Sequence, residues 1–332
     1  MNQSRDESGT LPASDSARVR KYRRLQSWYR EVQLQVPAGT YLKHERLGSY
    51  LSQAAVAKQR DLNFLHPAAH EHAERRAVEV QTEGGSLEPQ RLFHNMLSSM
   101  PLCFNLFGTM RGERNSFLPV FRSIFDVDAT RIVDIVCEWA PRDPAARIGD
   151  HTAFDAIIRY EADGERRFVG VETKYTESFS QQDYDTQPYR DVTAASGWFT
   201  DDPSARERLK HPKANQLWRN VMLASRLEQH GSEGQGSVAV VALNDDPGAV
   251  AAVDLVGLEM SPSHRDRLMS VSIERILDAT DAESPEISWW TTSFRRRYTD
   301  VSLPDSPEAS QDPTGPRLGR DLEKTTELAA TA

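Results

Sequence analysis

The dipeptide Asp163-Gly164 constrains the fold of this 332-residue chain more than any other short stretch. It separates two segments, residues 153–160 and 167–174, that both read as β-strands. A two-residue hairpin turn needs positive φ at both central positions, and Asp-Gly is one of the pairs that adopt it most readily. The sequence therefore predicts an antiparallel hairpin with its turn at Asp163-Gly164.

The predicted turn also determines which residues of the two strands face each other. With a two-residue loop, Asp155 lies directly opposite Glu172, and Lys174 shares the face of Glu172 because side chains alternate along a strand. Two carboxylates that face each other repel. We therefore expect a cation beside them, either Lys174 itself or a divalent metal such as Mg²⁺, which takes carboxylate oxygens as ligands.

The spacing of these residues resembles the active-site signature of the PD-(D/E)XK nuclease superfamily. Asp155 is followed after sixteen residues by Glu172, Thr173 and Lys174. Within that superfamily the chain is similar to a family of prokaryotic restriction endonucleases. The likeness covers roughly residues 40–300, although no Pro precedes Asp155, and it rests on FDAII at 154–158, VETKYTE at 171–177, LCFNLF at 102–107 and NQLWRN at 215–220.

The resemblance implies an α/β fold with a restriction-endonuclease-like core. That core has the order α-β-β-β-α-β, with a mixed central sheet flanked by helices, and this chain would add helices at both ends. Residue patterns alone support only an α/β or α+β domain. They agree with the order through a strand at 131–139, the hairpin, a helix over 213–229 and a continuous apolar run at 236–243, as expected of a strand buried on both faces.

The resemblance also implies roles for the site residues. Asp155 and Glu172 would hold Mg²⁺, with Mn²⁺ as an alternative, and a backbone carbonyl near Thr173 would add a ligand. Lys174 would orient or activate the attacking water, or stabilise charge on the phosphate. Gln216, on the helix after the hairpin, would position the water or Lys174. Two further acids, Glu88 and Glu138, are candidates for one more ligand, and the sequence does not choose between them.

The function implied is a metal-dependent endonuclease of the restriction or defence type that hydrolyses phosphodiester bonds in double-stranded DNA. The alternative is a catalytically inactive nuclease-fold protein that binds nucleic acid or a protein partner, but the presence of Asp155, Glu172 and Lys174 favours the enzyme. A third interpretation is a surface cluster of ion pairs on a hairpin, which burial would exclude. Enzymes that cut both strands are often homodimers, although no dimer interface is legible in the sequence.

Composition and charge limit the other classes. The net charge of −9 counts against a non-specific nucleic-acid binder, although it leaves room for a nuclease with local basic patches. No apolar run approaches the ~18 residues of a membrane span, and the N-terminus carries no apolar signal core. The two cysteines, Cys103 and Cys137, read as buried thiols in a reducing compartment. We therefore expect a cytoplasmic protein.

The sequence predicts one domain between two tails. Residues 1–16 are expected to be a disordered N-terminus, residues 17–302 a single nuclease-like domain with its core at about 86–245, and residues 303–332 a disordered C-terminal tail rich in Pro, Ser, Glu and Thr.

Three segments outside the hairpin carry further expectations. Residues 18–30 hold six basic residues and predict an amphipathic helix, for which an aromatic side packed on the domain is favoured over a phosphate-contacting arm. Residues 41–59 predict a second helix, and His70 and His72 after it are expected on a solvated polar helix. Residues 175–202 show neither helical nor strand period and predict a long loop, either functional or folded back as core.

Overall fold

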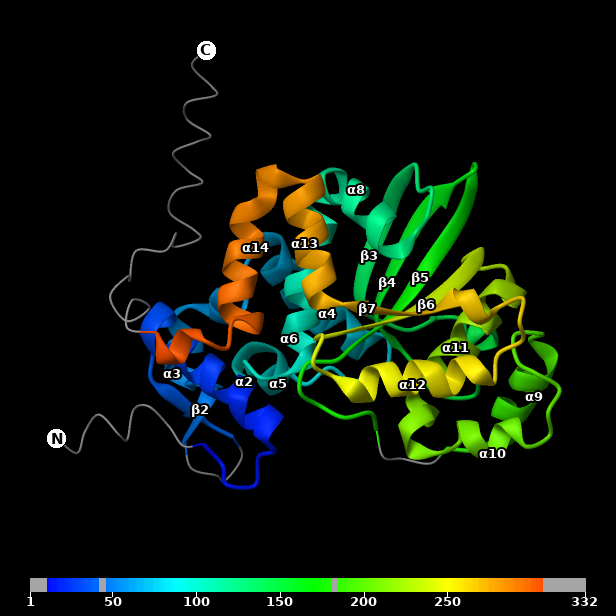
Figure 1. Ribbon diagram of the computed structural model, residues 1–332, viewed down its shortest axis with the longest axis horizontal. Helices are drawn as coiled ribbons and strands as arrows, with labels where there is room; N and C mark the ends of the chain where they lie inside the picture. Colours follow the sequence, from blue (N-terminus) through cyan, green and yellow to red (C-terminus); the bar gives the residue numbers. More distant parts are fainter. Residues whose placement is uncertain (1–10, 42–45, 181–183, 307–332) are drawn as a thin grey trace, which may run out of the picture.

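A five-stranded mixed sheet lies at the centre of the computed structural model, which describes residues 11–41, 46–180 and 184–306 (Figure 1). The first three strands pair antiparallel and the last two pair parallel, in the spatial order β3-β4-β5-β6-β7. Their bounds are β3 (Arg131–Trp139), β4 (Phe154–Ala162), β5 (Glu165–Thr173), β6 (Gln235–Ala242) and β7 (Leu268–Ser272).

The hairpin predicted from Asp163-Gly164 is present as β4 and β5. Asp163 has φ 54° and Gly164 has φ 77°, as the two-residue turn requires. The ladder runs from Ala162 opposite Glu165 to Ala156 opposite Val171. Continued by one step beyond these pairs, the same register sets Asp155 opposite Glu172, in line with the predicted pairing.

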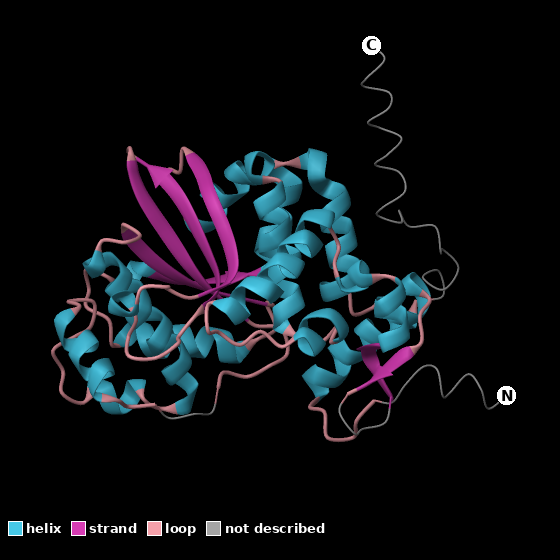
Figure 2. Ribbon diagram, turned by 180° about the vertical axis from the view of Figure 1, so that it is seen from behind, coloured by secondary structure: helices cyan, strands magenta, loops and turns pink. Residues whose placement is uncertain are grey.

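Helices cover both faces of the sheet (Figure 2). Strand β6 shows why, because its side chains alternate between two apolar cores: Ala239 and Val241 belong to one, and Val238 and Val240 to the other. The first core is covered by α4 (Pro67–Thr82), α6 (Ser99–Cys103), α8 (Arg114–Phe125), α13 (Ile273–Glu283) and α14 (Ser288–Phe294). The second is covered by α9 (Gln187–Ala195), α10 (Ala205–Leu209), α11 (Pro212–His230) and α12 (Pro247–Leu258).

The remaining helices are short or lie in the N-terminal part. They are α2 (Ala17–Trp28), α3 (Gln53–Lys58), α5 (Pro89–His94) and α7 (Thr109–Gly112). Three π-helical segments continue α2, α6 and α14, at Tyr29–Leu34, Phe104–Gly108 and Arg295–Thr299. Single 3₁₀ turns occupy Arg60–Asn63, Pro144–Ala146, Arg265–Arg267, Pro285–Ile287 and Leu303–Asp305.

The order of elements confirms the predicted fold class. Helix α8, strands β3 to β5, helix α11 and strand β6 follow one another as α-β-β-β-α-β, in an α/β fold with a mixed sheet between helices. Strand β7 extends the sheet beyond this core, next to β6. None of the helices in the described part of the chain combines the length and the apolar character needed to cross a membrane.

The N-terminal part corrects one prediction. The segment expected as a helix over 41–59 instead contains strand β2 (Arg46–Leu51) before the short α3, and β2 pairs with β1 (Ala38–Thr40) in a small second sheet. The backbones approach closely, because a Cβ at Gly39 would collide with the carbonyl group of Leu51. This pairing of two segments, rather than local propensity, determines the structure here.

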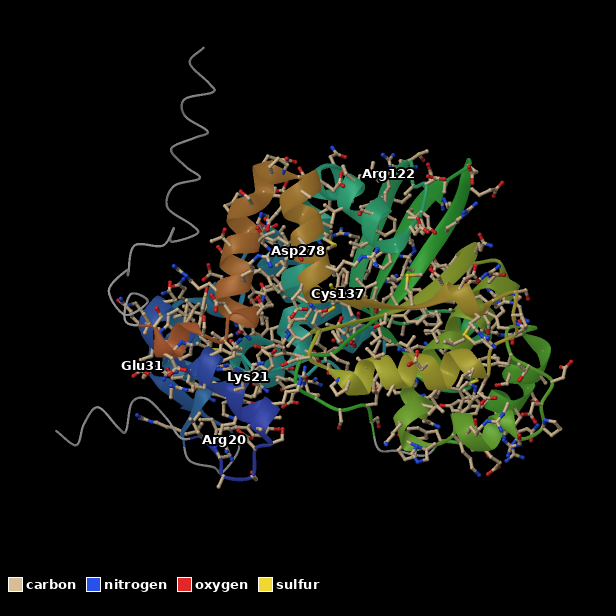
Figure 3. The ribbon with its side chains drawn as sticks, in the orientation of Figure 1. Arg20, Lys21, Glu31, Arg122, Cys137 and Asp278 are labelled. Carbon is tan, nitrogen blue, oxygen red and sulfur yellow. The ribbon has the colours of Figure 1, made fainter. Side chains whose placement is uncertain are left out.

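The basic residues of α2 are engaged by the protein itself. Arg18 and Lys21 bind Asp245 at 3.2 and 2.8 Å, and Arg23 binds Asp15 at 2.6 Å. The aromatic side of the helix is buried in the first core, with Tyr22 only 3% exposed. Arg20 and Lys21 are exposed, and Figure 3 shows them in the N-terminal part of the molecule. The interpretation as a packed helix is therefore favoured over a phosphate-contacting arm.

The predicted tails fall mostly outside the described residues, which begin at residue 11 and end at 306. Ser16 caps the N-terminus of α2 by accepting a hydrogen bond from the backbone N–H of Val19 at 3.2 Å, so the first helix begins where the domain was expected to begin. The division into tail, domain and tail stays a prediction.

Candidate active site

Two carboxylates face each other at one end of the neighbouring strands β4 and β5. Asp155 is the second residue of β4 and Glu172 the penultimate residue of β5, and both point to the face that α11 covers. The backbone N–H of Thr173 donates to Oδ2 of Asp155 at 2.7 Å, which ties the two strands together at the site. The thiol of Cys103 donates to the carbonyl oxygen of Asp155 at 3.2 Å from behind.

Lys174 follows β5 directly and turns back onto Glu172. Its ammonium lies 2.9 Å from Oε1 of Glu172 and 3.1 Å from Oε1 of Gln216. The ring of Phe179 lies beneath it, with 4.4 Å between Nζ and the ring centroid. Lys174 is 6% exposed and Glu172 3%, so the interpretation as a surface ion-pair cluster is excluded.

Helix α11 brings two amides to the same carboxylate. Gln216 donates from Nε2 to Oε1 of Glu172 at 2.6 Å, and Asn220 donates from Nδ2 to Oε2 at 2.7 Å. The two residues are four apart, so they lie on one face of the helix. Sequence reasoning named Gln216 and missed Asn220, although the spacing to Asn220 was the signal that could have found it.

Burial and mutual repulsion dominate the electrostatics. Burial raises the pKa of Asp155 well above its usual range, and the nearby carboxylates of Glu172 and Glu138 raise it further. Burial disfavours the charged form of Lys174, but Glu172 and Asp155 outweigh it and raise its pKa above the ordinary value. Lys174 is therefore an ammonium at neutral pH, and the site favours additional positive charge.

Glu138 is a third acid within electrostatic reach. The pairs Cys137–Ala156 and Trp139–Phe154 set Glu138 opposite Asp155. Glu138 has φ 52°, a conformation that is uncommon for residues other than glycine. Arg76 holds its peptide, because its guanidinium donates to the carbonyl oxygens of Cys137 at 3.0 Å and Glu138 at 2.8 Å. Burial raises the pKa of Glu138 to about 7, against the opposing charge of Arg91.

The site opens into a polar cavity of about 530 Å³. Its wall includes Arg91 of helix α5, Glu88 directly before that helix, and Glu177 from the segment after β5. Glu177 is fixed by the backbone N–H of Ser99 at 2.8 Å and by Arg91 at 3.1 Å. Of the two acids considered as a further metal ligand, Glu88 thus lines the cavity. Glu138 interacts electrostatically with Asp155 and Glu172. The sequence gave no role to Arg91 or Glu177. The other lining residues are Tyr41, Tyr50, Asn95, Ser99, Asp155, Glu172, Lys174, Ser178, Ser180 and Gln216.

The donor atoms at this edge fit a hard divalent cation. Oδ2 of Asp155 accepts one hydrogen bond and Oδ1 accepts none from the described residues, and Oε2 of Glu172 accepts one, which leaves lone pairs on both groups. Within the described part of the chain no three His, Cys, Asp or Glu side chains gather closely enough to hold a metal by themselves. Two carboxylates with open positions suit Mg²⁺, which keeps several waters, whereas the typical Zn²⁺ site includes His or Cys beside any carboxylate.

The structure thus brings together all four residues that the sequence selected: Asp155, Glu172, Lys174 and Gln216. Their arrangement can present an ammonium and a cation-binding carboxylate pair to an anionic substrate. Compared with known families, residues 13–300 match the family model described as PD-(D/E)XK nuclease superfamily. No curated protein and no solved structure matched the chain.

Proposed function

The chain belongs to the PD-(D/E)XK nuclease superfamily, and on that premise we propose that it is a Mg²⁺-dependent endonuclease that hydrolyses phosphodiester bonds in DNA. One observation carries the proposal: Asp155 lies opposite a buried Glu172 whose two oxygens are held by Lys174, Gln216 and Asn220. A buried carboxylate needs such partners. Their geometry leaves Asp155 facing the cavity, where a cation and a phosphate fit.

Each residue has a separate task in this proposal. Hydrolysis forms a bond from a water oxygen to phosphorus and breaks the bond to one sugar oxygen, which takes up a proton. Asp155 and Glu172 would hold the metal, which when bound supplies a water of lowered pKa and neutralises charge on the phosphate. Lys174, kept as an ammonium, stabilises the developing negative charge on phosphate oxygens. Gln216 fixes the positions of Lys174 and Glu172, since it contacts both.

The competing function is a nuclease-fold protein that binds without cutting. Such a protein has no need to retain a lysine that is 6% exposed between a carboxylate, an amide and an aromatic ring. Burying that charge costs free energy that its partners must offset. Retention of the whole constellation supports the enzyme.

Calorimetric titration with Mg²⁺ and with Mn²⁺ tests the metal site directly. Wild type should bind the ion and Asp155→Ala should not. Asp278→Ala should match wild type, because Asp278 is an exposed acid of α13 that pairs with Arg295. The titration is repeated with oligonucleotide present, since substrate phosphate can complete the site. If neither ion binds in any of these mixtures, the protein is better explained as a nuclease-fold protein that does not cut.

Cleavage assays test the reaction itself. Lys174→Ala should abolish cleavage of DNA, whereas Lys58→Ala, at an exposed position on α3, should cleave like wild type. Circular dichroism of both variants serves to check folding. Retained cleavage in Lys174→Ala would show that Lys174 has no catalytic role.

The finer expectations remain part of the proposal. They are a double-stranded DNA substrate, a role in restriction or defence in a prokaryotic cell, action in the cytoplasm, and a homodimer for cutting both strands. Panels of DNA and RNA substrates and the mass of the protein in solution check these points.

A further inference from the structure

A second cavity of about 650 Å³ adjoins the catalytic one. This volume lies within the range of small-ligand pockets, about 300–1,000 Å³. Lys174, Glu177 and Ser178 line both cavities, so the two lie side by side at the catalytic lysine. A polymer whose phosphate lies at Asp155 therefore passes from one cavity toward the other.

The walls of this cavity are mostly apolar. Helix α12 presents small residues, among them Gly248, Ala251 and Ala252, and Leu255 extends the same wall. The ring of Phe179 lines the cavity from the segment after β5. Small side chains leave room for a planar group to lie on the helix. These walls differ from the polar lining of the catalytic cavity.

Lys213 adds an uncompensated charge at the border of the cavity. It is exposed in the first turn of α11, one turn before Gln216, and it lines the second cavity. Arg18 also lines it, but Asp245 and Asp246 neutralise Arg18 at 3.2 and 3.4 Å. Among the described residues no carboxylate lies within ion-pair distance of the Lys213 ammonium. Within the described part of the chain, Lys213 thus offers an anion a cation that no carboxylate pairs.

We propose that the second cavity is a nucleotide subsite: it takes a base unstacked from the DNA strand beside the scissile phosphate, and Lys213 binds the phosphate of that nucleotide. An apolar chamber suits the base, and the ammonium suits the phosphate. The shared lysine places the subsite next to the bond that is cut. This inference deepens the proposed function and rests on it for the identity of the substrate.

Binding in EDTA tests the subsite without any cleavage. The probe is a fluorescein-labelled single-stranded DNA of about 12 nucleotides, a length within the usual site sizes, and the readout is anisotropy. Ala251→Glu places a carboxylate in the cavity and should weaken binding about tenfold. The matched control is Leu258→Glu, which adds the same charge to the same helix at a position that is 65% exposed and outside the cavity.

The salt dependence of binding isolates the phosphate contact. Lys213→Ala should reduce the slope of log Kd against log salt by about 0.7, the value for one phosphate of a single strand. Lys58→Ala, which removes a charge outside both cavities, should leave the slope unchanged. Equal affinities for Ala251→Glu and Leu258→Glu overturn the subsite whatever Lys213→Ala does, and so does a wild type that binds no strand.

Cleavage then links the subsite to the cut. For this assay the strand is used both alone and annealed to its complement, and an abasic residue is moved stepwise past the scissile position in it. One position directly beside the cut should lower kcat/KM about tenfold in wild type, and it should have no further effect in Ala251→Glu, because both changes remove one interaction. Additive losses overturn the subsite. If wild type cuts nothing in Mg²⁺, the proposed function fails, and the comparison in EDTA still decides the subsite.

Discussion

The side-chain amide of Asn220 lies 2.7 Å from Oε2 of Glu172, and both groups are buried, at 2% and 3% exposure. Gln216, one turn earlier on α11, donates to the other oxygen at 2.6 Å. One helix therefore fixes both oxygens of the carboxylate that stands opposite Asp155. The orientation of Glu172 depends on how α11 lies on the sheet.

Replacing Asn220 with Leu should impair the site more than the fold. The change leaves Oε2 of Glu172 without its donor, at a cost of about 1–3 kcal/mol in the free energy of unfolding. Groups that orient a metal ligand typically contribute 10–100-fold, so we expect activity to fall by about that factor and the Mg²⁺ concentration for half-maximal activity to rise. Ser225→Ala, which removes another buried polar group of α11, is the control. Unchanged Mg²⁺ dependence would remove the positioning role.

The two charges of the Glu172–Lys174 pair should be coupled in their effect on stability. Lys174→Met and Glu172→Gln each leave one buried charge without its partner, so each should lower the free energy of unfolding by about 2–4 kcal/mol. The double variant leaves neither charge and should recover at least about 1 kcal/mol of the summed loss. Urea unfolding measures the cycle, and all three variants should be inactive. Strictly additive losses would argue that the two groups do not interact.

Gly170 should tolerate no side chain. It lies on β5 two residue pairs from the site, and a Cβ there would come within 2.8 Å of three ring atoms of Phe154, the neighbour of Asp155. Gly170→Ala should therefore cost about 1–3 kcal/mol by overpacking and reduce activity by displacing Asp155. Phe154→Leu in the same chain should restore part of both.

The control for Gly170 is a glycine with space around it. Gly257 in α12 has nothing within 4 Å of a built Cβ, so Gly257→Ala should raise the free energy of unfolding by about 0.5–1 kcal/mol. Thermal or urea unfolding measures both changes. If Gly170→Ala instead raised the free energy of unfolding, the ring of Phe154 would have moved aside without loss of packing, and the prediction would be wrong.

His72 should make the fold sensitive to acid. Burial lowers its pKa to about 3, and the charges of Arg111, Arg75 and Arg76 add to this, against about 6.5 in the unfolded chain. Its Nε2 accepts the backbone N–H of Cys137 at 3.0 Å. Between these pKa values the unfolded chain binds a proton that the fold does not. Stability is therefore complete above about pH 6.5 and falls below it, by up to about 1.4 kcal/mol per pH unit.

Urea unfolding at several pH values checks this. His72→Gln should show a shallower loss between about pH 6.5 and 4.5, because one titrating group is gone. His151→Gln, at an exposed position, should keep the slope of wild type. Identical slopes in all three proteins would contradict the assignment.

The centre of the site was predictable because it is local. A two-residue turn sets the register, and the register alone places Asp155 opposite Glu172 and Lys174 beside it. Asp155 and Thr173, the two that share a hydrogen bond, are only eighteen positions apart in the sequence. The resemblance added Gln216, whose contact no local rule supplies. Its role and those of the other three residues stay predictions.

The rest depended on tertiary contacts. Asn220, Arg91 and Glu177 reach the site only because α11 and α5 pack where they do. His72 was expected on a solvated helix, yet α4 packs against β3 and buries it. The predicted loop at 175–202 contains helix α9 (Gln187–Ala195), whose Tyr189 belongs to the second core. Each of these outcomes was decided by burial against a distant segment, which single-sequence patterns do not report.

The antiparallel hairpin also separates the two ends of the sheet. The C-terminal ends of strands β3, β5, β6 and β7 all lie at the end of the sheet that carries the site. The turn at Asp163-Gly164 lies at the opposite end. Eight residues of strand put that turn about 25 Å from Asp155, and the side chain of Asp163 is 74% exposed. The turn is thus a natural point for attaching a fluorophore or an affinity tag, which would leave the chemistry untouched while following the hairpin as it folds.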